Sequence, residues 1–292
     1  MAVRIGVSIA DFSGTSGPRL GSDLAAVGRA LDDAGFDMIG VMDHFFQIAM
    51  IGPPEDDMLE AYTTLGYLAA STSRARLLTV VTGVPYRHPG VLGKIITTLD
   101  VLSGGRAWLG IGAAWYEQEA RALGIPFPPL AERFEQLEEA LQICLQMWSG
   151  DETPFRGEHF QLDRPLNHPQ AITRPHPPIM IGGAGERKTL RLVARYAQAC
   201  NLFFPGPQLP HKLEVLRAHC EAVGRDYNEI EKSVLFHLDV GQRGERASEV
   251  VDQLGKLAEL GVGTAICNVA RIWDRTPIEI IGSEIIPAVA AL

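Results

Sequence analysis

The sequence predicts a single (β/α)8 barrel, the TIM-barrel class of α/β fold. Three observations predict it: short runs rich in Val, Ile and Leu alternate with amphipathic segments, eight such runs occur, and most are apolar throughout. Continuous apolar runs are typical of parallel strands covered by helices on both faces, and eight alternating units favour a closed barrel. The predicted strands are Val3–Ala10, Asp37–Met42, Leu77–Gly83, Ala107–Ile111, Pro178–Gly182, Ala199–Phe204, Lys232–Val240 and Gly263–Cys267.

The predicted helices lie between these strands and have recognisable ends. Ser22 is expected to cap the first helix, and Gly35 is expected to end it. The clearest apolar stripe runs along a long helix from Leu130 to Trp148. An open dinucleotide-binding sheet is less well supported, because the turn after the first strand lacks the G-x-G-x-x-G pattern.

The eight-fold rhythm breaks once, after the fourth βα unit. Residues 150–178 are polar and rich in proline, and they contain a hairpin-like segment at Thr153–Leu162. Long loops inside compact domains are commonly lids or binding loops. We therefore expect 150–178 to be an insertion over the barrel mouth, within one domain that spans residues 1–292.

Composition limits the classes of partner. No apolar run reaches the roughly 18 residues that a membrane span needs, and a net charge of -9 would repel the phosphates of a nucleic acid. The N-terminal residues lack the pattern of a secretory signal. We expect a cytoplasmic protein that acts on a small molecule and binds neither membranes nor nucleic acids. Its scattered cysteines are expected to be reduced core thiols: Cys144, Cys200, Cys220 and Cys267.

Polar residues stand at the carboxyl ends of predicted strands, where barrels of this class keep their active sites. Asp43 and His44 directly follow the second strand and could donate a hydrogen bond or a proton to a ligand. Arg87 and His88, after the third strand, could face an acidic group. Both pairs have a purely structural alternative. Asp43 could simply cap its loop beside a solvated His44, and Arg87 and His88 could belong to an ordinary strand-to-helix turn.

Small residues at two other strand ends could seat a flat ligand. Gly83 ends the third strand and lets the backbone bend or approach a ring closely. After the fourth strand, Ala113 and Ala114 precede Trp115 and could form a shelf for a planar ring. Gln118 could hydrogen-bond the same ligand. The alternative at both places is close packing of a strand on a helix.

The segment after the fifth strand is the best candidate for a phosphate site. Free amides at a helix start preceded by glycines bind anions, and Arg187 and Lys188 would add positive charge. A tight turn is the alternative. Elsewhere, Glu117 and Glu119 are expected to serve the first turn of a helix. The predicted phosphate-binding residues are Gly182, Gly183, Ala184 and Gly185.

Other site classes lack support in the sequence. It contains no His-Glu-x-x-His pattern, no metal-spaced carboxylate cluster and no Gly-x-Ser-x-Gly elbow. We therefore expect no metal ion, and the hydrolase and metalloenzyme classes are disfavoured.

Taken in order, the motifs resemble those of the bacterial luciferase-like superfamily of flavin and deazaflavin oxidoreductases over nearly the whole chain. Asp-His-Phe after the second strand is similar to the branch that uses coenzyme F420. The segments that carry the resemblance are Gly35-Phe36-Asp37, Asp43-His44-Phe45, Thr82-Gly83-Val84, Tyr86-Arg87-His88-Pro89, Thr98-Leu99-Asp100-Val101-Leu102-Ser103-Gly104-Gly105-Arg106, Leu109-Gly110-Ile111-Gly112-Ala113-Ala114-Trp115 and Pro178-Ile179-Met180-Ile181-Gly182-Gly183.

The resemblance implies roles for several residues. His44 would lie near the reactive part of the deazaflavin with Asp43 beside it, and Gly83–Val84 would match a non-prolyl cis peptide that presses on the ring. Gly182 and Gly183 would hold the phosphate of the cofactor tail. This chain has Trp115 at the position where some members of the branch place an acidic proton donor. The candidate catalytic residues are His44, Asp43 and Trp115.

Three functions follow as hypotheses. The first is an oxidoreductase that transfers a hydride between coenzyme F420 and a small organic substrate, with His44 handling the proton. The second keeps the fold but uses reduced FMN, as a monooxygenase. The third is a cofactor-binding or carrier protein without catalysis. Members of the superfamily are often dimers, so a homodimer is expected, with the early helices as one place for its interface.

Overall fold

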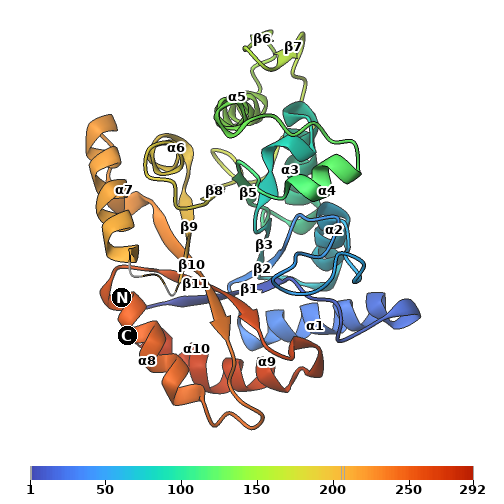
Figure 1. Cartoon of the computed structure of the whole chain (residues 1–292), viewed down its shortest axis with the longest axis vertical. Helices are drawn as coiled ribbons and strands as arrows, with labels where there is room; N and C mark the ends of the chain where they lie inside the picture. The colour runs from blue at the N-terminus through green and yellow to red at the C-terminus, as the bar shows by residue number, and fades with distance from the viewer. Residues whose placement is uncertain (1, 205, 207, 292) are drawn as a thin grey trace.

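The computed structural model describes residues 2–204, 206 and 208–291, and it confirms the predicted barrel class (Figure 1). Parallel strands form one nearly closed sheet, and helices surround it. All the predicted strands are present, each within two residues of its predicted ends, except the third, which is divided. The strands are β1 (Arg4–Ile9), β2 (Met38–Val41), β3 (Arg76–Thr79), β4 (Thr82–Gly83), β5 (Leu109–Gly112), β8 (Ile179–Gly182), β9 (Ala199–Phe203), β10 (Glu231–Leu238) and β11 (Thr264–Val269), with a separate hairpin of β6 (Phe155–Arg156) and β7 (Gln161–Leu162).

The barrel closes at the third predicted strand. The order of hydrogen-bonded strands is β3-β2-β1-β11-β10-β9-β8-β5-β4, so it begins and ends with the two halves of one segment. Beside this joint, Thr79 Oγ1 donates a hydrogen bond to the carbonyl of Gly110 at 2.8 Å. The amide of Trp108 also donates to the carbonyl of Leu77 at 2.9 Å. The segment of β3 and β4 therefore occupies one of eight positions around the cylinder.

The helices cover the outside of the barrel, and the two ends of the chain lie close together (Figure 1). Gly35 ends α1 in the left-handed conformation, as predicted, with a φ of 88°. The prediction that Ser22 caps α1 is wrong: a 3₁₀ turn leads into the helix earlier, and Ser22 donates to the carbonyl of Arg19 inside the first turn. The helices are α1 (Leu20–Ala34), α2 (Ala61–Ser71), α3 (Pro89–Ser103), α4 (Glu117–Ala122), α5 (Leu130–Ser149), α6 (Thr189–Tyr196), α7 (Leu209–Val223), α8 (Ala247–Glu259), α9 (Thr276–Ile280) and α10 (Ile286–Ala290), with 3₁₀ turns η1 (Gly17–Arg19), η2 (Val84–Tyr86), η3 (Tyr227–Glu229) and η4 (Ile272–Asp274) and a π-helical turn η5 (Ile281–Ile285).

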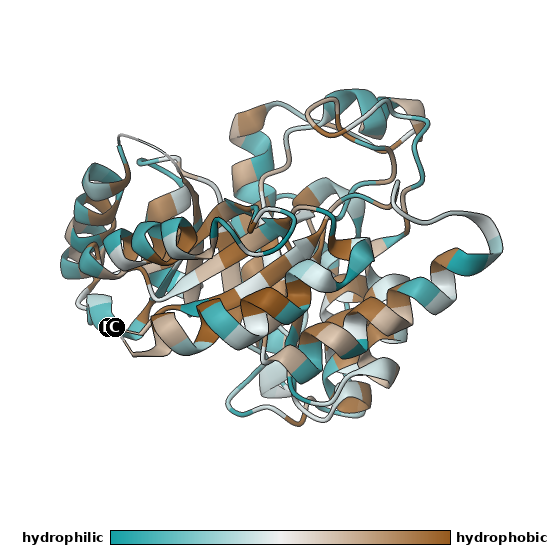
Figure 2. Ribbon diagram, turned by 90° about the horizontal axis from the view of Figure 1, so that it is seen from below, coloured by the Kyte–Doolittle hydropathy of each residue, from teal (hydrophilic) through white to brown (hydrophobic). Residues whose placement is uncertain are grey.

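The core has an outer layer between strands and helices and a smaller interior cluster on the barrel axis. In Figure 2 the strands are mostly hydrophobic, whereas the helices alternate between hydrophobic and hydrophilic residues. The four cysteines are all buried and unpaired, as predicted. Within the described residues, no helix is both long enough and apolar enough to cross a membrane. The interior cluster consists of Met38, Leu78, Met180, Ala199 and Ile266, which come from five different strands.

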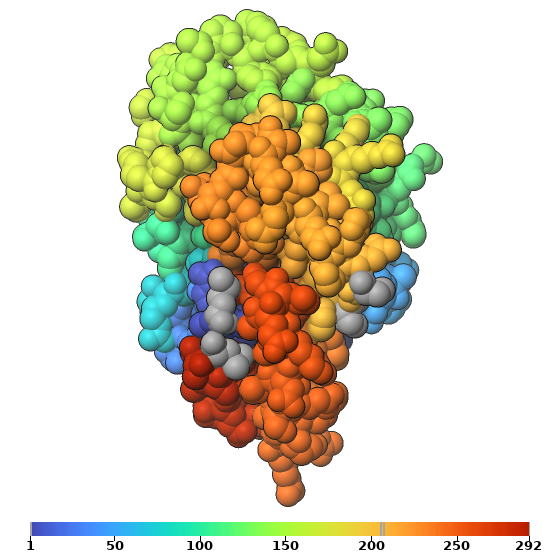
Figure 3. Space-filling view, turned by 90° about the vertical axis from the view of Figure 1, so that its left-hand side faces the viewer, coloured from blue at the N-terminus to red at the C-terminus, as the bar shows by residue number. Residues whose placement is uncertain are grey.

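Residues 150–178 lie between α5 and β8 and contain the predicted hairpin, formed by β6 and β7. Glu139 of α5 accepts hydrogen bonds from the amides of 158–160, at distances between 2.6 and 3.1 Å. Asp100 of α3 accepts from the amides of Ile172 and Thr173 at 2.7 and 2.9 Å. These contacts fix the segment against α5 and α3, where it forms one end of the molecule (Figure 3). Its placement over the barrel mouth stays a prediction.

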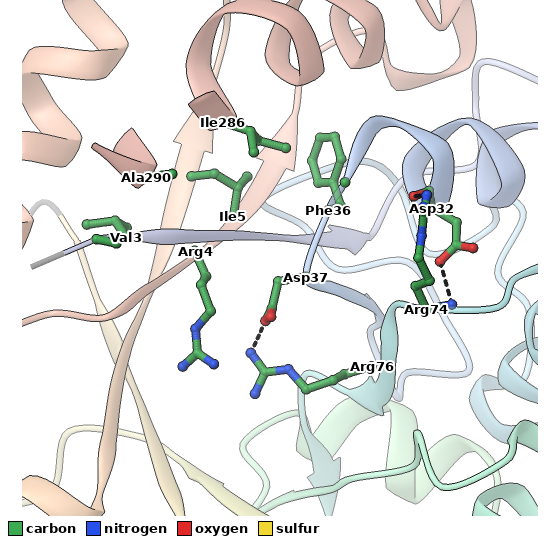
Figure 4. A pocket seen from close by; sticks show the side chains of 12 residues that line it. Val3, Arg4, Ile5, Asp32, Phe36, Asp37, Arg74, Arg76, Ile286 and Ala290 are labelled. Carbon is green, nitrogen blue, oxygen red and sulfur yellow. Dashed lines mark hydrogen bonds and ion pairs between the residues drawn. The ribbon is translucent and has the colours of Figure 1, made fainter. Parts of the chain in front are cut away.

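A polar network closes the amino-terminal end of the barrel, beside a cavity of about 370 Å³ (Figure 4). Arg76 pairs with Asp37 and, at 3.1 Å, with Glu231, which also pairs with Arg4 at 2.6 Å. The guanidinium of Arg76 lies over the ring of Trp108, 4.5 Å from its centroid. Burial alone would raise the pKa of Glu231, but Arg76 outweighs it and holds that pKa below its ordinary value. This charged network ties together the starts of β1, β2, β3 and β10.

Asp32 joins the end of α1 to the turn before β3, and its loss is expected to destabilise the fold. Its buried carboxylate accepts from the amides of Ser73, Arg74 and Ala75 at 2.7 to 3.0 Å. Asp32→Asn is expected to lower the free energy of unfolding by about 2 kcal/mol at pH 7. The backbone amides that now donate to a charged carboxylate would face a neutral carboxamide, whose oxygen is a weaker acceptor and whose NH2 group repels them. Urea unfolding measures this loss.

The pH dependence of this difference gives a further check. Burial alone would raise the pKa of Asp32, but the three amides outweigh it and hold the pKa below its ordinary value. The stabilisation is therefore complete above the ordinary carboxyl pKa and is lost as the pH falls through the lower, folded-state pKa. Asp33→Asn is the matched control, because the neighbouring side chain is 85% exposed. Equal losses for both variants would contradict the prediction.

Candidate active site

Asp43 and Arg87 form a buried ion pair at the carboxyl end of β2. Both carboxylate oxygens of Asp43 accept from Arg87, at 2.5 and 3.0 Å, and Arg87 also pairs with Glu60. The guanidinium of Arg87 lies 4.6 Å from the ring centroid of Tyr62, which is buried beneath it. Burial raises the pKa of Asp43, and the ion pair with Arg87 opposes that rise. Asp43 and Arg87, two of the predicted site residues, are thus held by each other.

His44 is held by a carboxylate whose role the sequence prediction missed. Glu119 is fully buried, and its Oε1 lies 3.0 Å from His44 Nδ1 and 2.7 Å from the hydroxyl of Tyr86. Its Oε2 accepts from the amides of Phe45 and Phe46 at 2.5 and 2.8 Å. Glu119 lies in the first turn of α4, as predicted, but its side chain reaches across to the loop after β2.

These contacts determine which nitrogen of His44 is free. Burial alone would raise the pKa of Glu119, but hydrogen bonds from His44, Phe46 and Tyr86 outweigh it and hold that pKa below its ordinary value. The carboxylate is therefore ionised at neutral pH and can only accept hydrogen bonds, so His44 Nδ1 carries a hydrogen. His44 Nε2 has no hydrogen-bond partner among the described residues and is the nitrogen that can exchange a proton with a ligand.

An aromatic wall stands beside His44. Trp115 is 57% exposed, and its ring meets that of His44 edge to face at a centroid distance of 5.4 Å. Tyr116 stacks on Trp115 at 5.1 Å. The predicted shelf residues Ala113 and Ala114 are half-buried at the same strand end, whereas Gln118 is exposed on α4. Trp115 carries no ionisable group, so it can shape and shield a ligand but cannot supply a proton.

The non-prolyl cis peptide joins Val80 to Val81, and its predicted position at Gly83–Val84 is wrong. Gly83 cannot form that break, because it lies in regular strand β4 and pairs with Gly112 of β5. The interruption comes earlier, between β3 and β4, where Thr79 Oγ1 accepts from the amide of Thr82 at 3.2 Å. Both valine side chains are half-buried and apolar, in contact with the cluster on the barrel axis.

Glycines on neighbouring strands make room for the two valines. A Cβ atom at Gly40 would lie 2.6 Å from Val80, and one at Gly182 would lie 2.9 Å from Val81. A Cβ atom at Gly112 would lie 3.1 Å from Val81. These distances leave no space for side chains, so the valines and the three glycines form one apolar surface, which we call the valine shelf.

The segment after β8 offers hydrogen-bond donors. Gly183 has a positive φ of 116° and donates its amide to the carbonyl of Asn201 at 3.1 Å. The following amides, 184–188, donate to no acceptor in the described part of the chain. Arg187 and Lys188 form no ion pair with any described carboxylate. A cavity of about 400 Å³ lies here, lined by Phe134, Ala184, Gly185, Glu186, Arg187, Lys188 and Lys212.

The structure brings most of the predicted site residues to one end of the barrel. A Cβ atom at Gly83 would lie 2.9 Å from Ala114, and one at Gly112 would lie 3.2 Å from the carbonyl of Gly182, so three strand ends meet. Sequence reasoning missed Glu119 and the valine shelf. The available signals were an acidic residue beside Ala120 on the buried side of α4, and glycines at or next to the last position of β2, β5 and β8.

Comparisons with known proteins agree with this architecture. The chain is 32% identical over 205 residues to an uncharacterized protein of Mycobacterium tuberculosis, which covers 70% of this chain and 67% of that protein. It is 28% identical over 270 residues to the F420-dependent glucose-6-phosphate dehydrogenase of Nakamurella multipartita, which covers 88% and 76% of the two chains.

Solved structures share the fold across nearly the whole chain. The coenzyme F420-dependent tetrahydromethanopterin reductase of Methanopyrus kandleri has a TM-score of 0.80 at 17% identity, covering 98% and 99% of the two chains. The oxygenating constituent of 3,6-diketocamphane monooxygenase from Pseudomonas putida, in complex with FMN, has a TM-score of 0.75 at 19% identity, covering 98% of each. The luciferase-like monooxygenase family model matches residues 3–276, which confirms the resemblance seen in the motifs. The chain therefore belongs to the luciferase-like monooxygenase family.

Proposed function

We propose that the protein is an oxidoreductase that transfers a hydride between coenzyme F420 and a small organic substrate. The observation that carries this proposal is the pairing of His44 with Glu119, which leaves Nε2 free at the same barrel end as the valine shelf and the free amides of 184–188. The similarity to F420-dependent glucose-6-phosphate dehydrogenases supports the choice of cofactor.

The residues present fit a flat ring with an anionic tail. Val80 and Val81 offer an apolar surface that is not covered by the core, with Ala113 and Ala114 half-buried nearby. Such a surface suits an apolar ring face, because both can exclude water from each other. When bound, the deazaflavin would accept or donate a hydride in one two-electron step.

The phosphate of the cofactor tail would be held by the amides of 184–188, with Arg187 and Lys188 adding positive charge. Amides that precede a helix and have no internal acceptor are the usual donors to phosphate. The acidic chain as a whole would repel an anion, so this local group of donors is needed.

His44 would handle the proton that accompanies the hydride. If the substrate is an alcohol, its O–H proton would pass to Nε2 while its C–H hydride leaves, and a carbonyl forms. Glu119 then stabilises the positive charge on the imidazole and keeps the ring in place. Asp43 is proposed to position the loop through Arg87, and Trp115 to shield the reacting atoms from water.

A titration with both cofactors tests the proposal. Reduced FMN, used by a monooxygenase, is the alternative that the FMN-containing relatives favour, and its ring and phosphate would use the same residues. We expect purified protein to bind F420 at least tenfold more tightly than FMN, measured by fluorescence quenching. Tighter binding of FMN would favour the monooxygenase. Tight F420 binding with no turnover of any alcohol or carbonyl compound would favour a carrier protein.

A further inference from the structure

Three strand ends at the barrel mouth carry side chains that the proposed cofactor site does not use: Phe203 of β9, His237 of β10 and Asn268 of β11. Alternate residues of a strand face the same side. Ala199 and Ile266 belong to the cluster on the barrel axis, so Phe203 and Asn268, at even spacing from them, also face inward. His237 is in register with Asn268 on the neighbouring strand.

The rest of the protein leaves these side chains either exposed or without a hydrogen-bond partner. Phe203 is 64% exposed, and His237 is exposed without a hydrogen bond to any described residue. The carboxamide oxygen of Asn268 is buried and accepts no hydrogen bond from any residue in the described ranges. Buried polar atoms in native proteins nearly always have a partner, so an unpartnered oxygen that faces the mouth points to a ligand that donates a hydrogen bond.

The same region is electrically neutral. Asp239, after β10, pairs with Arg246 at 3.0 Å and with Arg271 at 3.3 Å, and Glu249 also pairs with Arg246 at 3.2 Å, so two carboxylates balance the two cations. The other two arginines of these loops belong to segments beside α9: Arg275 precedes that helix, and Gly244, which follows Arg243, lies close to Ile280. Unpaired cations near a ligand site occur instead beside the amides of 184–188.

We propose that the substrate is an uncharged organic molecule with a hydroxyl or N–H group apart from its reacting carbon, and that Asn268 selects it by accepting a hydrogen bond from that group. Phe203 would contact the apolar part of the molecule. This inference rests on the proposed function, since it assigns the substrate to the side of the mouth that the cofactor leaves free. A phosphorylated sugar, which the relative from Nakamurella multipartita is named for, would find the arginines Arg246 and Arg271 of these loops already paired with carboxylates.

The test compares the binding of matched pairs of compounds to Asn268→Leu and to the unchanged protein, with ligand-observed NMR as the measurement. The pairs are glucose with glucose 6-phosphate, glycerol with glycerol 3-phosphate, and cyclohexane-1,2-diol with cyclohexanol. We expect at least one neutral polyol to bind the unchanged protein and to lose tenfold or more in affinity in Asn268→Leu. The phosphorylated partners should bind, if at all, equally to both proteins and in competition with inorganic phosphate.

Two results would overturn the inference. One is that a phosphorylated compound binds and loses affinity in Asn268→Leu, and the other is that no neutral compound in the panel loses affinity in Asn268→Leu. Asn228→Leu, on the exposed turn η3, is the matched control and should change nothing. Asn268→Leu should melt at the same temperature as the unchanged protein or higher, because it removes an unpartnered oxygen. F420 titration of both proteins separates the two proposals: failure of F420 to bind rejects the proposed function, whereas normal F420 binding without dependence on Asn268 rejects only this inference.

Discussion

Replacing His44 with alanine is expected to lower turnover by about two to four orders of magnitude, the usual contribution of a positioned acid–base group. Nε2 of His44 is the free nitrogen at the same barrel end as the valine shelf, and alanine leaves no group there that can exchange a proton. The dissociation constant of F420 should change by less than about tenfold, because the shelf and the amides of 184–188 are untouched. Steady-state kinetics and a fluorescence titration measure the two quantities.

The control for His44 is another histidine at the surface. His168 is 69% exposed in the insertion, and His168→Ala should leave both turnover and cofactor binding unchanged. Unchanged turnover in His44→Ala would remove His44 from the mechanism. A parallel loss of F420 binding would instead assign it to the cofactor site.

Glu119→Gln is expected to have the second largest effect, because Glu119 joins four hydrogen-bond donors from two loops. A carboxamide has one oxygen, so two of the four donors would lose their acceptor and face an N–H group. Each buried donor left in this way costs about 1 to 3 kcal/mol, and we expect the free energy of unfolding to fall by about 2 to 4 kcal/mol. Turnover should fall by about 10 to 100-fold, since His44 would no longer be held with Nε2 free.

The division between kcat and KM separates positioning from a general loosening of the site. If Glu119 positions His44, kcat should fall while KM and the affinity for F420 stay within about twofold. Glu117→Gln is the matched control, because Glu117 lies in the same turn of α4 but is exposed, and among the described residues it pairs only with Arg121, at 2.7 Å. An equal fall in kcat for Glu117→Gln, or an affinity for F420 that falls as much as kcat, would contradict the positioning role.

The strands could be predicted from the sequence because their signal is local. Runs such as Met38–Val41 and Ile179–Gly182 are apolar throughout and end at residues that break the pattern, so each fixes its own position. The end of α1 at Gly35 is also local, since a left-handed residue there favours glycine. Even here the start of α1 was predicted too late, because the preceding 3₁₀ turn has no strong sequence signal.

The site was less predictable because its critical contacts join distant segments. His44 and Glu119 are 75 residues apart, and no periodicity connects them. Val80 and Val81 look like ordinary strand residues, and the family resemblance pointed to Gly83–Val84 instead. The three glycines on neighbouring strands leave the space that the valines occupy, and this relation becomes clear once the strands are placed side by side.

The divided third strand has a consequence for how the protein could evolve. The seam at which the cylinder closes and the surface proposed for the cofactor ring belong to the same few residues, from Thr79 to Thr82. A change that altered this surface would also disturb the fastening. If the proposed sites are right, substitutions at the ends of β9, β10 and β11 can change the substrate, whereas substitutions at the proposed ring surface would also destabilise the barrel.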